Sequence, residues 1–388
     1  MSLSLKIKKD SLDRLGDYLL AITVLVQYPL TLLQSFWIDS GTMAEEMAGL
    51  IRVAGSVLAV VCLIFLGIKR NLVVSLAVYF LWTLIFAHSI FLQMANLEYI
   101  MSEGIRFTLC TAVPIFLSFI SIKELRIFFQ VALYISLLST VVAFFYIAYY
   151  LTGQMTMMDD IYNMSLGYAL LFPTLYFMYH KKMKFLVIAF LLVLIILIAG
   201  SRGPVVPILA YFLLQKLVLG TLRDRFWLIM LLVLVLLSFP VVISLLDDWG
   251  INSRTLTMLA EGVADSDSGR SVLYDKVVVK ILESPLLGYG VFSDRVFEGG
   301  VYCHNLFLEL LVDFGCVLTP LMLLISFVYL SFLMKRLDGL ELSFLMLLIL
   351  LAIPPLLVSS SYLIDFRIPL LIGYVYMLSK KYFKIKWH

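Results

Sequence analysis

The sequence predicts an all-α, polytopic membrane protein with about 12 transmembrane helices and one large outer loop. Hydrophobic residues make up 62% of the 388 residues and charged residues only 14%, whereas a soluble domain is about half apolar and a quarter charged. The apolar residues also gather in long runs, each close to the ~20 residues that a helix needs to cross a bilayer. Together these two observations exclude a soluble protein.

The apolar runs fill almost the whole chain, so no soluble domain of ordinary size fits between them. The predicted spans are residues 16–37, 49–68, 71–94, 104–121, 127–151, 165–180, 185–200, 204–220, 226–246, 305–333, 340–359 and 367–380. The seventh and eighth spans are short and are joined by a Gly-rich turn. A re-entrant pair of helices would give the same pattern there.

Charged residues in the turns predict that both termini lie in the cytoplasm. Cytoplasmic turns of membrane proteins are rich in Lys and Arg, and basic residues occupy alternate turns of this chain: Lys69, Arg70, Lys123, Arg126, Lys181, Lys182, Lys184, Arg223, Arg225, Lys335 and Arg336. Acidic residues occupy the turns between them: Asp39, Glu45, Glu46, Glu98, Asp159, Asp160, Asp247 and Asp248. The N-terminal residues 1–17 are expected to lead into the first span, since no cleavage site follows a short apolar run.

The chain is therefore expected to divide into nine N-terminal transmembrane helices (1–246), an outer loop (247–303) and three C-terminal helices (304–388). The loop contains a predicted amphipathic helix over residues 271–283, with Leu273, Val277 and Ile281 on one face. A Pro/Gly-rich turn follows at residues 285–290. A loop of this length is usually functional or disordered, and its own helix favours an ordered, functional segment.

Basic residues on the predicted outer side are mostly arginine. Nine of the 29 Lys and Arg residues lie there, and seven are Arg: Arg52, Arg106, Arg202, Arg254, Arg270, Arg295 and Arg367. The planar guanidinium binds phosphate oxygens in a bidentate manner, whereas Lys is a point charge. The bias indicates an outer-facing site for an anionic, phosphorylated substrate, although each arginine alone also fits an interfacial anchor.

Two patches of the sequence combine these arginines with glycine. Arg202 lies in the turn Gly200–Pro204, where glycines allow close approach of a ligand and the next helix offers free N–H groups. A tight turn with an anchoring Arg is the equally plain interpretation. Arg270 follows Gly269 and precedes Tyr274 on the loop helix; the lysines of that helix, Lys276 and Lys280, fit a solvated face.

A third patch surrounds His304 at the mouth of the tenth span. Among the four histidines, only His304 lies at a predicted outer boundary after a polar loop, and an imidazole titrates near neutral pH and suits general-base catalysis. Asn305, Glu309 and Asp313 recur every four residues and form a polar stripe that enters the membrane, where carboxylates indicate function or pairing. Glu309 could orient His304 or an Arg, or hold two helices together as an ion pair. Adjacent side chains seldom face each other, so Cys303 is a poor nucleophile candidate beside His304.

Other classes of site find no support in the sequence. The chain has no basic domain for nucleic acid. Cys303 and Cys316 flank one predicted helix and are ~20 Å apart at a rise of 1.5 Å per residue, too far for a disulfide. No Cys/His cluster has the spacing of a metal site, and no cofactor is expected.

The patches, in their order, resemble the O-antigen polymerase and O-antigen ligase superfamily of bacterial envelope glycosyltransferases. That pattern is a Ser-Arg-Gly turn between two spans, an Arg-led helix in a large outer loop, a Pro-Leu-x-Gly-x-Gly turn, and His-Asn-x-x-Leu-Glu at the mouth of a span. The matching residues are 201–203, 269–270, 285–290 and 304–309, so the resemblance covers about residues 200–320. Tyr274 stands where Trp is common.

The resemblance implies a GT-C-like, metal-independent glycosyltransferase in the bacterial cytoplasmic membrane that uses polyprenyl-diphosphate-linked glycans. His304 would be the general base, and Arg202 and Arg270 would neutralise the leaving diphosphate in a single, inverting displacement. Substrate-binding roles are expected for the other residues singled out above: Arg52, Arg106, Arg254, Arg295, Arg367, Asn305, Glu309 and Tyr274. The expected partners are a lipid-linked donor and acceptor, membrane lipids and, as one further candidate, a chain-length regulator protein, but no nucleic acid.

Three functions remain open from the sequence. A polymerase would accept a second polyprenyl-diphosphate-linked repeat unit, for O-antigen or capsular polysaccharide. A ligase would instead transfer the glycan to lipid A core. A flippase or other transporter would be expected to show broken helices near the membrane midplane and internal symmetry, whereas the polar residues here crowd the outer side.

Overall fold

The computed structural model describes residues 2–152, 163–201, 203–226, 229–230 and 270–383. Throughout these ranges the regular structure is helical, and no strand is present. The prediction of an all-α polytopic membrane protein is confirmed. Most of the predicted span 226–246 and most of the predicted loop, up to residue 269, lie outside the described residues.

A helix occupies each of the remaining predicted spans, so the apolar runs of the sequence locate the helices well. The elements before the predicted loop are α1 (Ser2–Leu25), α2 (Gln27–Asp39), α3 (Glu45–Cys62), η1 (Leu63–Gly67), α4 (Ile68–Arg70), α5 (Leu72–Leu92), α6 (Asn96–Tyr99), η2 (Ile100–Ala112), α7 (Val113–Ile120), α8 (Leu125–Leu151), α9 (Met164–Tyr179), α10 (Met183–Ile198) and α11 (Val205–Val218). Those after it are α14 (Arg270–Glu283), α15 (Ser293–Phe297), α16 (Leu306–Met334), α17 (Gly339–Val358) and α18 (Arg367–Phe383). Both η1 and η2 are π-helical.

Six of the described helical segments are long and apolar enough to cross a membrane, and a seventh is reached if the bent pair α1–α2 is one span. The shorter apolar helices α10 and α11 add two further hydrophobic segments. The predicted number of 12 spans stays a prediction, because several predicted spans correspond to helices of 17 residues or fewer.

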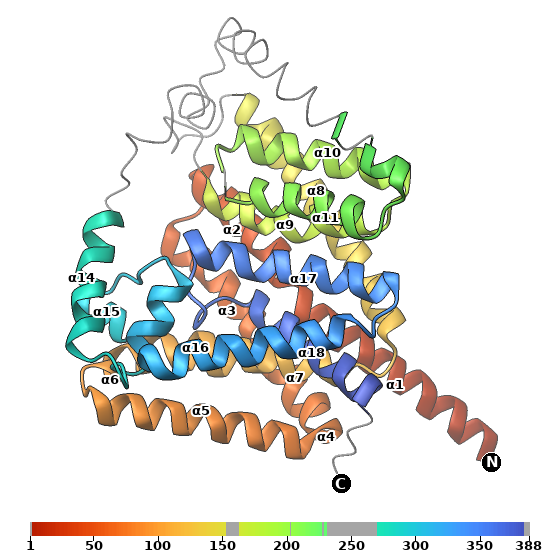
Figure 1. The fold of residues 1–388 in the computed structure, drawn as a ribbon. Coiled ribbons are helices and arrows are strands. Elements are labelled where there is room, and N and C mark those ends of the chain that lie inside the picture. The colour runs from red at the N-terminus through yellow and green to blue at the C-terminus, as the bar shows by residue number, and fades with distance from the viewer. Residues whose placement is uncertain (1, 153–162, 202, 227–228, 231–269, 384–388) are drawn as a thin grey trace, which may run out of the picture.

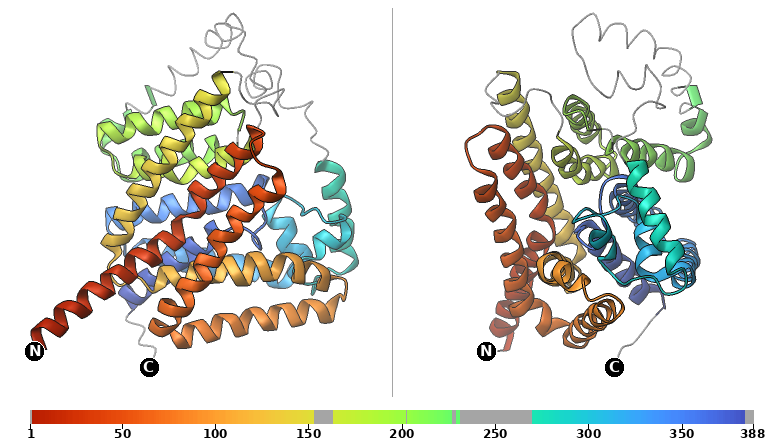
Figure 2. Two further views of the ribbon diagram at one scale, coloured as in Figure 1. Left: turned by 180° about the vertical axis from the view of Figure 1, so that it is seen from behind. Right: turned by 90° about the vertical axis from the view of Figure 1, so that its left-hand side faces the viewer.

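The long helices lie side by side, with the described segments of the predicted loop, α14 and α15, at one end of the bundle (Figure 1). The helices α14 and α15 lie at that end, which we call the loop end, and α1 begins and α18 ends at the opposite end. Seen at right angles, α1–α3 and α14–α16 lie on opposite sides of the bundle (Figure 2). A pocket between these two groups of helices would therefore have the N-terminal helices as one of its walls.

One hydrophobic core joins the two halves of the chain, and many aromatic rings pack within it. Phe344 of α17 packs edge-on against Phe128 of α8, with ring centroids 6.2 Å apart, and against Tyr374 of α18 at 4.9 Å. Edge-to-face pairs of this kind stabilise by about 0.5–1.5 kcal/mol beyond the burial of their area. The N-terminal helices are thus part of the same packed unit as the C-terminal ones.

The first predicted span is broken at Val26, where α1 and α2 meet at an angle of 44°. Pro29 in the first turn of α2 explains the break, because it has no N–H to donate to the carbonyl of Leu25. The break places Gln27, the first residue of α2, in the interior with only 5% of its surface exposed.

The helix α16 is kinked at Gly315, whose φ of 73° and ψ of 178° are not helical. The kink frees backbone groups for the Pro/Gly-rich turn at 285–290. Tyr289 N–H donates to the Val312 carbonyl (2.8 Å), and Gly290 N–H donates to the Asp313 carbonyl (2.9 Å). Cys316 N–H in turn donates to the Pro285 carbonyl (2.6 Å). The turn motif of the sequence is therefore the part of the loop that docks on the broken helix.

We expect Gly315→Ala to lower the stability of the folded protein by at least about 1–3 kcal/mol, the usual range for a residue held in a backbone region that favours glycine. An added Cβ would also overlap the Leu286 carbonyl oxygen. Thermal unfolding in detergent measures the loss. The control is Gly339→Ala, where an added Cβ meets nothing within 4 Å; equal melting temperatures for the two variants would contradict the docking described here.

Candidate functional site

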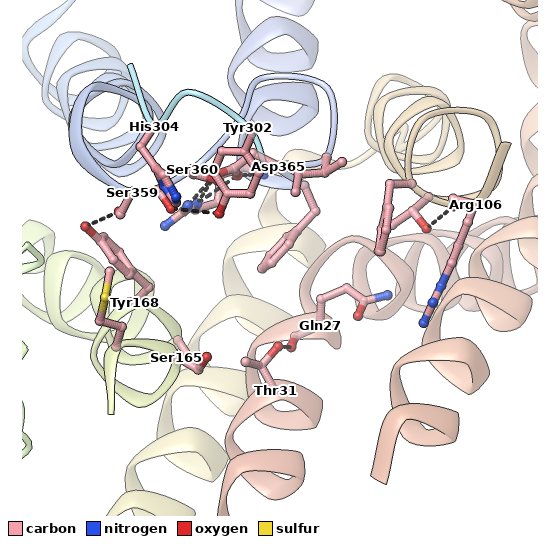
Figure 3. Close-up of a pocket in the computed structure, with 17 residues that line it drawn as sticks. Gln27, Thr31, Arg106, Ser165, Tyr168, Tyr302, His304, Ser359, Ser360 and Asp365 are labelled. Carbon is pink, nitrogen blue, oxygen red and sulfur yellow. Dashed lines mark hydrogen bonds and ion pairs between the residues drawn. The ribbon is translucent and has the colours of Figure 1, made fainter. Parts of the chain in front are cut away.

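A pocket of about 450 Å³ lies between the N-terminal helices and the segments that flank α16 and α18. This is within the usual size of a small-molecule site, about 300–1,000 Å³. Three residues predicted from the sequence line it: Arg106, His304 and Arg367. Figure 3 shows the pocket residues, which are Gln27, Thr31, Arg106, Phe107, Thr111, Met164, Ser165, Tyr168, Ala169, Tyr302, His304, Ser359, Ser360, Ile364, Asp365, Phe366 and Arg367.

His304 reaches the pocket from the short segment between α15 and α16. Its φ of 52° is in the left-handed region, which His adopts more readily than most residues, and its ring packs on that of Tyr302 with centroids 4.2 Å apart. The next residue, Asn305, begins α16 as its N-cap and accepts hydrogen bonds from the N–H groups of Phe307 (3.0 Å) and Leu308 (3.3 Å). Asn305 therefore has a clear structural role, and its predicted contact with substrate stays a prediction.

The imidazole of His304 is electronically suited to accept a proton. Burial lowers its pKa from the ordinary value of 6.5, and the positive charge of Arg270 lowers the pKa further. The backbone of Ser359 acts in the opposite direction. The Nδ1 atom of His304 is buried and has no hydrogen-bond partner among the described residues. The lowered pKa favours the neutral form of the ring, which is the form that can accept a proton.

Arg270, the first residue of α14, lowers the pKa of His304 through its charge but does not line the pocket. Of the three residues predicted to be catalytic, His304 lines the pocket. The same helix carries Tyr274, which is half-buried and does not line the pocket.

Arg202, the third predicted catalytic residue, lies outside the described residues, but its neighbours on both sides pack against α9. A Cβ at Gly203 would overlap the hydroxyl of Tyr168, and a Cβ at Gly167 would overlap the side chain of Ser201. Tyr168 lines the pocket and accepts a hydrogen bond from the Ser359 hydroxyl (2.6 Å). The Ser-Arg-Gly turn thus adjoins a wall of the pocket, and a glycine is needed where it touches Tyr168.

Arg367 lines the pocket but is engaged with a carboxylate of its own chain. Its Nε donates to both oxygens of Asp365, at 2.8 Å and 3.1 Å, and its guanidinium lies over the ring of Tyr168, 5.1 Å from the centroid. The predicted contact of Arg367 with substrate stays a prediction. The pairing with Asp365 leaves less net positive charge than the sequence alone indicated.

Arg295 is fully buried and is held by three carboxylates from different segments. It contacts Asp294 beside it (2.7 Å), Glu103 of η2 (3.0 Å) and Glu309 of α16 (3.2 Å), and donates to the Ser361 hydroxyl (2.8 Å). We call these five residues the Arg295 cluster. The acidic partners raise the pKa of Arg295 even though burial lowers it.

The sequence allowed Glu309 to pair with His304 or with an arginine. In the structure it pairs with Arg295. The next acid of the polar stripe, Asp313, accepts hydrogen bonds from the hydroxyls of Tyr362 (2.6 Å) and Ser293 (3.1 Å). Both carboxylates therefore connect α16 to the neighbouring segments of the chain. The arrangement favours a structural role for Arg295 and Glu309, and substrate contacts for either stay predictions.

Most of the polar residues of the pocket wall were not predicted from the sequence. Gln27, Thr31, Ser165 and Tyr168 are single polar residues within apolar helices, and no motif distinguishes them. Their polarity within predicted spans was the one available signal, since polar groups in a span usually face a cavity or a partner.

The remaining predicted residues are less informative. Arg254 and the side chain of Arg52 lie outside what the structure describes. Cys303 is buried, and burial and the nearby Asp294 raise the pKa of its thiol, which disfavours the thiolate. Within the described ranges, no group of three or more His, Cys, Asp or Glu side chains is placed to hold a metal ion.

Comparison with known proteins identifies part of the chain. Residues 187–323 match the family model for O-antigen ligase. The resemblance predicted from the sequence is thus confirmed over about a third of the chain. No curated protein and no solved structure matches it.

The O-antigen ligase segment contains every motif that carried the resemblance, including positions 201–203, Arg270, the turn at 285–290 and His304. The family is one of glycosyl-transfer enzymes and covers O-antigen ligases and related polymerases. The wall formed by Gln27, Thr31 and Arg106 lies outside the segment, as does the loop of residues 359–366. Within the matched segment Tyr302 and His304 line the pocket, and its other described lining residues come from parts of the chain that the family match does not reach.

We expect Arg295→Met to lower the free energy of unfolding by about 3–5 kcal/mol, as removal of one partner of a buried ion pair does. The loss arises because Asp294 and Glu309 remain buried without their cation. Thermal unfolding in detergent measures it. The control is Lys276→Met: Lys276 pairs with Glu298 at 3.3 Å but is 59% exposed, so about 0–1 kcal/mol is expected. A loss for Arg295→Met no larger than that of the control would contradict the importance of the cluster.

Proposed function

We propose that this protein is a glycosyltransferase that polymerises polyprenyl-diphosphate-linked oligosaccharide repeat units into O-antigen or capsular polysaccharide at the outer face of the bacterial cytoplasmic membrane. The observation that carries the proposal is the position of His304. It faces a 450 Å³ pocket under the charge of Arg270, within a segment that matches the O-antigen ligase family.

In the proposed reaction an acceptor sugar hydroxyl attacks the anomeric carbon of the donor. The new bond forms to the acceptor oxygen, the bond to the diphosphate oxygen breaks, and His304 takes the hydroxyl proton. A base with a lowered pKa suits this step, since it is unprotonated at neutral pH. A single displacement inverts the anomeric centre.

Arg270 and Arg202 are proposed to neutralise the charge that develops on the leaving diphosphate, because cations placed where charge develops stabilise the transition state strongly. Two observations support these roles: the electrostatic action of Arg270 on His304, and the packing of Ser201 and Gly203 around Tyr168 of the pocket wall. The reaction as written needs no metal ion.

A ligase that transfers the glycan to lipid A core is the second candidate, and the description of the matched family favours it. Both enzymes would use the same donor and differ in the acceptor. A transporter is the third candidate; a histidine of lowered pKa in the pocket, within the matched segment, favours chemistry over transport.

Glycan profiling of a deletion strain tests the proposal and separates the candidates. A polymerase predicts loss of the polymer ladder while one repeat unit still reaches lipid A core. A ligase predicts loss of all attached glycan. An unchanged ladder would contradict both.

Complementation of that strain with His304→Ala should give about 10²–10⁴-fold less polymer, the usual contribution of a general base, while membrane insertion persists. The control is His88→Ala, because His88 is exposed on α5 and does not line the pocket. Full polymer output from His304→Ala would remove His304 from the mechanism.

The pH dependence of transfer gives a separate prediction. Activity should fall as the pH drops through the lowered pKa of His304, because the protonated ring cannot accept a proton. Arg270→Gln removes one cause of the lowering, so the pKa of His304 should rise toward 6.5 and the acidic limb of the rate profile should move to higher pH.

Initial rates of reconstituted enzyme across the acidic range measure this shift, read from the shape of the profile and not from its height. Lys276→Gln is the control, since Lys276 is not among the causes of the shift at His304. An acidic limb that stays in place in Arg270→Gln, or moves to lower pH, would contradict the proposed electrostatic coupling.

A further inference from the structure

The pocket wall across from His304 is formed by α2 and η2 and has no role in the steps described so far. Gln27 and Thr31 of α2 lie across the pocket from His304 and Ser359, and Arg106 of η2 lies at the far end from Tyr168 (Figure 3). This wall lies outside the O-antigen ligase segment. Its polar lining residues include Gln27, Thr31 and Arg106.

Gln27 offers a buried hydrogen-bond donor with nothing to bind. The residue is 5% exposed, and its Nε2 has no partner among the described residues. An unsatisfied buried amide costs about 1–3 kcal/mol, so its retention needs an explanation. Its backbone carbonyl is engaged, since it accepts the Thr31 hydroxyl at 2.8 Å; the free group is the side-chain amide.

Arg106 offers a cation on the same wall. Unlike Arg295 and Arg367, it has no carboxylate within ion-pairing distance in the part of the chain that the structure describes. Its guanidinium is exposed and lies 4.9 Å from the centroid of the Phe107 ring. Thr111, five residues on in the π-helical η2, also lines the pocket, and its hydroxyl donates to the Arg106 carbonyl (2.9 Å).

An interfacial anchor would explain Arg106 alone. It would not explain the unpartnered amide of Gln27 in the same pocket. A guanidinium and an amide N–H are both donors, and such a pair is suited to an oxyanion, since charge-assisted hydrogen bonds to oxyanions are the stronger kind.

We infer that Gln27 and Arg106 form a second oxyanion subsite, which holds the acceptor substrate against the wall across from His304. The inference rests on the proposed function, in which the acceptor hydroxyl must lie between the imidazole and the opposite wall. The oxyanion is either the diphosphate of a second lipid-linked unit or the carboxylate of an acidic sugar in the glycan.

Calorimetric titration of the detergent-purified protein tests the subsite with two probes, inorganic diphosphate and sodium glucuronate. The variants are Arg106→Gln and Gln27→Glu, and the control is Arg126→Gln, an exposed arginine at the start of α8 that does not line the pocket. Loss of one charge-assisted hydrogen bond corresponds to about tenfold weaker binding or more.

We expect at least one probe to bind about tenfold or more weakly to both pocket variants, and as wild type to Arg126→Gln. Weakening confined to diphosphate would identify the acceptor's own diphosphate as the ligand, and weakening confined to glucuronate would identify an acidic sugar. Wild-type affinity of Arg106→Gln for both probes, or no binding of either probe to wild type, would overturn the subsite. Since Arg106 is exposed, misfolding does not confound this variant.

The titration measures binding and not transfer. Its outcome is therefore independent of the glycan profile that tests the proposed function. If the protein is a transferase without this subsite, the deletion strain loses the polymer ladder but the titration shows no specific binding. If the protein has another function, the titration can still show binding while the ladder is unchanged.

Discussion

The burial of the Arg295 guanidinium is the constraint on which the arrangement of the pocket depends. Removing a cation from water costs several kcal/mol, and the cost is offset only if carboxylates come close with good geometry. Those carboxylates come from Asp294 beside it, from Glu103 of η2 and from Glu309 of α16. The segments must therefore meet at one point. Asp294 also accepts the N–H of Cys303 (3.0 Å), the residue before His304.

A second constraint acts from the other side of the loop. The kink at Gly315 exposes the carbonyls of Val312 and Asp313, which accept hydrogen bonds from the turn at 285–290. The chain between this turn and α16 is thus held at both ends. The segment that carries His304 has little freedom, which fits a base that must be positioned before substrate arrives.

The sequence predicted the helices well, because apolar runs of the length of a bilayer allow few other structures. It also singled out His304, Arg202 and Arg270, since the family motifs fall in one segment, and His304 lines the pocket. It did not reveal the break at Val26, which requires attention to one proline, nor the partners of Arg295. Such partners are set by three-dimensional contacts between residues far apart, such as Glu103 and Arg295. Gln27 and Thr31 gave no signal, because single polar residues in apolar helices are common.

The Arg295 cluster is expected to hold His304 in the pocket. Titration of His304 by NMR, in protein labelled at its four histidines and with the signal assigned by His304→Gln, tests this. We expect a pKa below 6.5 in the wild type, because burial and the charge of Arg270 both lower it. In Glu309→Leu, which removes an acid that does not itself shift this ring, the pKa should return toward 6.5 as the segment is released. An equally lowered pKa in a folded Glu309→Leu variant would contradict the claim.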